Sequence, residues 1–135
     1  MAMIDVMTNT ATQPVAPDSH QFLDRYNLLY HIEVARRLRA NPQDILTRAR
    51  QNLERWLPAH AGSFSEHALQ EWRGLLDQLN VVDLMKLITQ DSDEGQRLRQ
   101  STPFTGILTE TERAELWRRC AEGNLSRTHP ASERS

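Results

Sequence analysis

The 135-residue sequence contains little cysteine and no long apolar run, and each shortage excludes a class of protein. Its single cysteine, Cys120, cannot form a disulfide within the chain, so we expect a reducing cytoplasmic compartment. No apolar stretch approaches the roughly 20 residues that cross a bilayer, and the first residues lack the basic and apolar parts of an export signal. No useful length of sequence alternates polar and apolar residues, which argues against a sheet protein.

The overall charge is that of an ordinary globular protein. The formal net charge is −2 and the isoelectric point is about 6.2, whereas a dedicated nucleic-acid binder carries a basic footprint. The length fits one domain. Residues 1–17 and 125–135 are polar and rich in turn-forming residues, so we expect disordered, flexible tails around a helical domain over residues 18–124.

Apolar residues recur at helical spacing through this domain. Good N-caps are Asn80, Ser92 and Thr109, the last forming a capping box with Glu112, and Gly123 is a typical helix stop. The sequence predicts an all-α, compact bundle of five or six helices, over residues 18–40, 42–58, 65–79, 80–88, 92–100 and 109–123.

The first helix carries apolar residues on two faces. Phe22, Tyr26, Leu29 and Tyr30 share one face, and Leu28, Ile32 and Ala35 lie nearly opposite. A central helix surrounded by its own neighbours explains this pattern. The alternative is that the stripe with Leu28 and Ile32 contacts a second chain, either another copy in a homodimer or a different protein.

Charge is unevenly distributed along the chain. Residues 25–55 carry a net charge of +4 and residues 66–94 a net charge of −5, and 15 of the 16 basic residues are arginine. Arg36, Arg37 and Arg39 cluster at the C-terminal end of the first helix, where cations are favoured by the helix dipole. The cluster is either a solvated helix end or a patch for a phosphate or an acidic partner.

The usual signatures of catalysis and metal binding are absent from the sequence. The acidic run at 91–95 places glycine at the fifth position of a calcium loop and Thr102 at the twelfth, which does not fit. The five histidines are scattered, and Cys120 lies late in a helix, where the dipole disfavours a thiolate. We therefore expect no cofactor, no metal and no enzymatic activity.

The irregular segment 96–109 is bounded by strong helix signals. It joins Arg97, Arg99 and Gln100 to Pro103 and Phe104, and arginine and aromatic side chains are common interface anchors. These five residues are a candidate partner-binding surface. The alternative is that Phe104 and Ile107 enter the core while the two arginines pair with nearby carboxylates.

Residues 82–101 contain two short expected helices joined by residues 90–92, which suggests a helix-turn-helix. Its second helix would present Arg97, Arg99 and Gln100 to bases and phosphates. The nearby acids Asp91, Asp93 and Glu94 would approach the DNA backbone, which argues against it. A DNA-binding transcriptional regulator is thus the second functional hypothesis.

The run from Arg97 to Arg113, RLRQSTPFTGILTETER, follows the helices that contain Trp56 and Trp72. In this arrangement residues 27–119 resemble a group of small helical bacterial proteins of toxin–antitoxin-like modules. The resemblance implies a non-enzymatic protein that binds and restrains a toxin encoded nearby. Repression of its own operon is a second role that the resemblance allows. Our leading hypothesis is an antitoxin-like protein that covers its partner through the first helix and the 97–106 segment.

Overall fold

The computed structural model of the chain describes residues 20–127, with side chains over residues 20–123. This part contains six helices and no strand: α2 (His20–Ala40), α3 (Pro42–Ala59), α4 (Phe64–Gln78), α5 (Val81–Ile88), α6 (Asp93–Arg99) and α7 (Glu110–Arg127). The predicted all-α class is confirmed. Within the described range, no helix is both long enough and apolar enough to cross a membrane.

The expected chain ends are tested only in part. The N-terminal tail over residues 1–17 and the last residues of the C-terminal tail, from 128 onward, lie outside the described residues. The prediction that Gly123 stops the last helix is wrong, because α7 continues through it to Arg127. Gly123 is not among the glycines with positive φ, so the left-handed stop conformation does not form.

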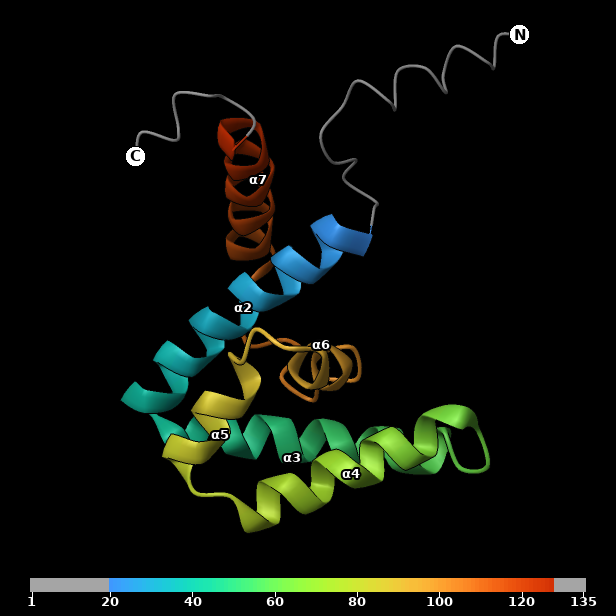
Figure 1. Cartoon of the computed structure of the whole chain (residues 1–135). Helices are drawn as coiled ribbons and strands as arrows, with labels where there is room; N and C mark the ends of the chain where they lie inside the picture. Colours follow the sequence, from blue (N-terminus) through green and yellow to red (C-terminus); the bar gives the residue numbers. More distant parts are fainter. Residues whose placement is uncertain (1–19, 128–135) are drawn as a thin grey trace, which may run out of the picture.

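Helix α2 is the centre of the bundle. It contacts α3, α5, α6 and α7, while α3 and α4 run side by side at one end of the molecule (Figure 1). Helix α7 packs against α2 at the other end of the molecule (Figure 1). The interpretation of the first helix as a central helix, surrounded by its neighbours, is therefore largely confirmed.

Helices α5, α6 and α7 start at the predicted caps. The side chain of Asn80 accepts the backbone N–H of Asp83 at 2.8 Å, and Ser92 Oγ accepts that of Gly95 at 3.1 Å. Helix α7 opens with the predicted capping box between Thr109 and Glu112. Helix α4 begins at Phe64, one residue before the range expected from the sequence, with Ser63 at its N-cap position.

Aromatic rings join the outer helix to the centre. The ring of Trp117 in α7 lies 4.7 Å from that of Phe22 and 5.0 Å from that of Tyr26, both in α2, measured between centroids. Phe22 and Leu116 are buried at this contact. Because aromatic pairs and apolar burial both favour association, α7 is held against α2 and the space between the two helices becomes a defined surface.

Candidate binding groove between helices α2 and α7

The segment between α6 and α7 is part of the core. Phe104 and Pro103 are fully buried, and the ring of Phe104 lies edge-on to that of Trp72 at 5.8 Å. Two buried side chains bind the backbone of this segment through three hydrogen bonds: Tyr30 donates to the Phe104 carbonyl at 2.7 Å, and Asn52 donates to the carbonyls of Pro103 and Thr105, each at 2.9 Å. The prediction that Pro103 and Phe104 form a contact surface is therefore wrong.

The arginines of this segment are already bound within the molecule. Arg97 forms ion pairs with Glu71 at 2.8 Å and Glu94 at 2.7 Å, and these hydrogen bonds raise the pKa of its guanidinium. Arg99 is 3% exposed, and its Nη1 donates to the carbonyls of Ile88 and Gln90. Of the predicted polar contacts in the segment, only Gln100 has an exposed side chain without a described polar partner.

The same contacts remove the features required of a recognition helix. Helix α6 has seven residues and packs against α2 and α5, and Trp72 donates its Nε1–H to the Leu98 carbonyl at 2.9 Å. Arg99 is buried, and the charge of Arg97 is paired with two carboxylates. Arg99 is therefore not accessible to DNA, and the charge of Arg97 is already paired, so α6 offers no free arginine to bases or phosphates.

The two residues of the predicted outer stripe on α2 lie in different hollows. Leu28 is half-buried in the wall of one hollow, whereas Ile32 is 46% exposed and lines another. Ala35, expected on the same stripe, is buried in the core. The stripe is therefore divided, and Ile32 is the member that offers apolar surface to solvent.

Ile32 belongs to an open groove of about 510 Å³ between α2 and α7, which we call the α2–α7 groove. Its apolar lining joins Ile32 and Leu29 of α2 to Leu108 and to Leu116 of α7. Charged side chains of both signs surround this lining: Glu33, Arg36, Arg37, Glu112, Glu115 and Arg119.

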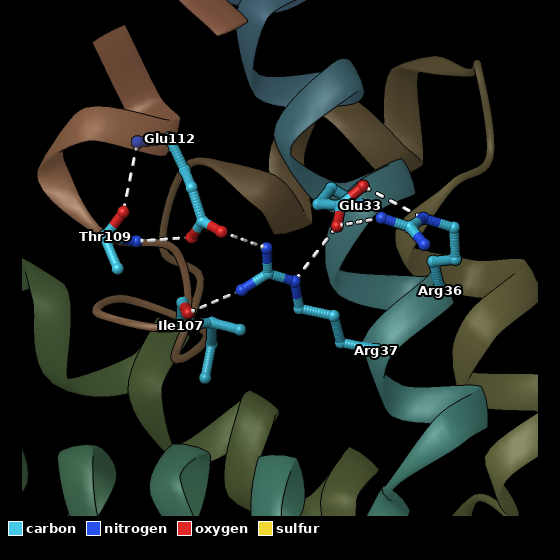
Figure 2. A network of polar contacts seen from close by, with 6 residues as sticks. All are labelled: Glu33, Arg36, Arg37, Ile107, Thr109 and Glu112. Atoms are coloured by element: carbon cyan, nitrogen blue, oxygen red, sulfur yellow. Dashed lines mark hydrogen bonds and ion pairs between the residues drawn. The ribbon is translucent and has the colours of Figure 1, made fainter. Parts of the chain in front are cut away.

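A network of polar contacts fixes one side of the groove (Figure 2). All three nitrogens of the Arg37 guanidinium are used: Nε donates to Glu33 at 3.0 Å, Nη1 to the Ile107 carbonyl at 3.1 Å, and Nη2 to Glu112 at 2.7 Å. Glu112 also accepts the backbone N–H of Thr109 through the capping box. Arg37 thereby links α2 to the first turn of α7 and sets the width of the groove.

The carboxylates of this network are kept ionised. The hydrogen bond from Arg37, with that from the Thr109 backbone, lowers the pKa of Glu112 to about 2. Burial would raise the pKa of Glu33, but hydrogen bonds from Arg36 and Arg37 outweigh it and lower the pKa. The network is therefore present at neutral pH and is lost only in acid.

These pairs change the interpretation of the arginine cluster. Arg36 donates to Glu33 through two nitrogens, and Arg37 is divided between Glu33 and Glu112. Arg39 is exposed and forms no ion pair with a described residue. A patch of three free cations for phosphate is not formed, and Arg36 and Arg37 instead belong to the charged edge of the α2–α7 groove.

The groove combines an apolar lining with charged sides, which is the general composition of a protein-binding surface. In the described part of the chain, no three His, Cys, Asp or Glu side chains are arranged to hold a metal ion. Comparison with protein-family models, with curated proteins and with solved structures found no match.

Sequence reasoning found some groove residues and missed others. It selected Ile32, Arg36 and Arg37, but it did not select Leu29, Leu116 or Arg119 as contact residues. Leu29 and Leu116 have the helical spacing of core residues, and only the packing of α7 on α2 places them beside an open surface. No signal in the sequence alone brings these two helices together.

Proposed function

We propose that this chain is a non-enzymatic protein-binding module that neutralises or regulates a partner protein by direct contact, in the manner of an antitoxin. The observation that supports this is the α2–α7 groove, in which Ile32 exposes 46% of its surface between two rows of charged side chains. A partner helix that places an apolar residue against Ile32 would remove this surface from water.

The charges around the groove favour a partner segment with charges of its own. Glu115 and Arg119 lie on the α7 side, and Glu33 and Arg36 on the α2 side, so each side carries both signs. Glu33 is paired with Arg36 and Glu115 with Arg118, so a partner would share these exposed pairs. A partner segment of alternating charge would find complementary groups on both sides, whereas a uniformly charged one would be repelled by half of them. The toxin-like partner inferred from the resemblance would carry such a segment near its active site.

The DNA-binding hypothesis has no observation of its own in its favour. Its two arginines are buried or paired, and the acids Asp93 and Glu94 occupy the first turn of α6, on the side that would face phosphate. Binding by a second copy of the chain would use the same groove, and a mass measurement in solution distinguishes it from binding by a different protein.

The test is a pair of substitutions at exposed apolar residues. Ile32→Asp places a charge in the groove, whereas Val82→Asp changes a residue of α5 that is 59% exposed and lies outside the groove. We expect both variants to fold. Ile32→Asp should weaken binding to the purified product of the neighbouring gene by about 2 kcal/mol, or about 30-fold, while Val82→Asp leaves it unchanged.

Growth of cells that co-express the neighbouring gene provides the functional measurement. The wild type and Val82→Asp should restore growth, and Ile32→Asp should not. Equal binding and equal rescue by both variants would remove the groove from the interface. A neighbouring product that neither binds nor harms the cell would contradict the antitoxin role itself, and a wild-type dimer converted to a monomer by Ile32→Asp would assign the groove to self-association.

A further inference from the structure

A second hollow lies beside the α2–α7 groove and has a different chemistry. Its volume is about 560 Å³, and it is lined by α2, by the segment around Asp91, by α6 and by the C-terminal part of α7. Leu29 and Arg119 line both hollows, so the two adjoin along α2 and α7. We call this second hollow the Arg99 pocket.

Arg99 enters this pocket with part of its guanidinium unsatisfied. The residue is 3% exposed, and Nη1 donates to the carbonyls of Ile88 at 3.1 Å and Gln90 at 2.9 Å. Its Nε is fully buried and has no hydrogen-bond partner. In a guanidinium, Nε and Nη2 form the edge that binds a carboxylate through two parallel hydrogen bonds, and this is the edge that remains without a partner.

A second arginine lines the same pocket in a similar state. Nε of Arg25 is buried without a hydrogen-bond partner, and the residue forms no ion pair with a described side chain. Buried donors without partners are rare in proteins, and two in one pocket point to a missing acceptor. The two residues that carry these donors line a hollow of about 560 Å³, a space large enough for a small molecule.

The backbone is built to hold Arg99 in this position. A Cβ atom at Gly95 would lie 2.2 Å from the Gln90 carbonyl oxygen and 3.0 Å from Arg99 Nη1, so glycine is needed for the close approach of the Gln90 carbonyl to α6. Glycine inside a helix is unfavourable in itself, and here the close approach explains it. The Gln90 carbonyl can therefore accept a hydrogen bond from Arg99 Nη1 at 2.9 Å.

The other groups of the pocket define which anion fits. Asp24 and Asp91 also line it and favour the charged form of Arg99, whose pKa is lowered overall by burial, but neither carboxylate is within ion-pair distance of it. Three arginines and two aspartates leave one net positive charge. That balance suits a single negative charge, and Leu28, Leu29 and Cys120 provide an apolar wall for the carbon part of a ligand.

We propose that the Arg99 pocket binds a small monocarboxylate, whose two oxygens accept hydrogen bonds from the free edge of Arg99 and from Arg25, with its apolar part against Leu28. A carboxylate is planar and matches the guanidinium edge, and its single charge is balanced by the pocket. The ligand is a small molecule, so this site is separate from the partner-binding role of the groove.

The experiment titrates the full-length, ¹⁵N-labelled protein with butyrate and follows the Nε–H signals of its arginines by NMR. Butyrate should shift the Arg25 and Arg99 signals along a saturable curve. Butyramide, which has the same shape and no charge, and inorganic phosphate should not produce this curve. A saturable effect of phosphate with none of butyrate would overturn the assignment to a carboxylate.

Variants separate the pocket from a general effect of added salt. Arg25→Gln removes a donor that has no described partner, so the fold should be retained, and the affinity for butyrate should fall about tenfold or more. Arg73→Gln removes an exposed α4 arginine that forms no described ion pair, and should leave the affinity unchanged. Equal affinity in both variants, or shifts that never saturate, would overturn the proposal.

Discussion

Glycine-to-alanine substitutions at two helical positions should change stability in opposite directions. Gly74 lies in α4 and Gly95 in α6, and neither has positive φ. Alanine is favoured over glycine in a helix by about 0.5–1 kcal/mol, so helix propensity alone predicts that both variants are more stable than the wild type. The space around each glycine differs, and it reverses the expected effect at Gly95 only.

At Gly74 an added Cβ meets nothing within 4 Å, so the propensity gain is retained. At Gly95 the added Cβ lies 2.2 Å from the Gln90 carbonyl oxygen, well inside the 3.4 Å at which ordinary contact begins. Overpacking of this kind costs about 1–3 kcal/mol. The Gln90 oxygen also accepts from Arg99, and loss of a hydrogen bond to a charged group costs about 1.5–3 kcal/mol.

These contributions predict that Gly74→Ala raises the free energy of unfolding by about 0.5–1 kcal/mol and that Gly95→Ala lowers it by about 1.5–5.5 kcal/mol. Urea denaturation followed by circular dichroism measures both, and an unchanged slope would show that the same transition is compared. If Gly95→Ala is as stable as the wild type, the close contact of α6 with the end of α5 is not present in solution.

Two further predictions concern the core contacts of α2 and α3. His31 is buried, its Nδ1–H donates to the Asn27 carbonyl, and its Nε2 accepts from the Thr102 hydroxyl. Burial lowers the pKa of this histidine from 6.5 to about 4. As the pH falls, the unfolded chain therefore binds a proton at His31 before the folded protein does. The free energy of unfolding should therefore fall by up to about 3 kcal/mol between pH 6.5 and 4, and a flat urea midpoint over this range would contradict it. Asn52→Ala removes the donor to the buried Pro103 carbonyl and to the more exposed Thr105 carbonyl, and should cost about 1–3 kcal/mol. Ala at the exposed neighbour Gln51 should cost almost nothing, and equal urea midpoints for the two variants would refute this role of Asn52.

Local signals predicted the helices of this protein well. Asn80, Ser92 and the pair of Thr109 and Glu112 act within one turn of sequence, and the backbone groups that they satisfy are their near neighbours. Such signals need no knowledge of the rest of the fold. Gly123 shows their limit, because its preference for a stop is weak and the surrounding residues continue the helix to Arg127.

The segment around Phe104 could not be placed from sequence, because apolar residues in an irregular segment have no period that marks an inner face. Its position depends on donors from distant helices: Tyr30 in α2 and Asn52 in α3 bind its carbonyl groups. Without those bonds the buried carbonyls would remain unsatisfied, and the segment would be more stable facing water. The sequence predicts that Pro103 and Phe104 are interface anchors, but they are core residues because the side chains of Tyr30 and Asn52 satisfy their carbonyl groups.

The candidate sites depend on distant contacts in the same way. Ile32 is exposed in a groove only because Trp117 anchors α7 beside α2 and Arg37 binds Glu112 across the gap. Arg25 and Arg99 line one pocket only because α6 packs against α2. A sequence pattern indicates whether a residue favours burial or solvent. A binding surface is instead marked by groups that the folded chain does not satisfy, such as an apolar side chain in water or a buried donor without an acceptor. Such unsatisfied groups can be identified only in the folded structure, and they are the reason to expect a partner in the α2–α7 groove and a ligand in the Arg99 pocket.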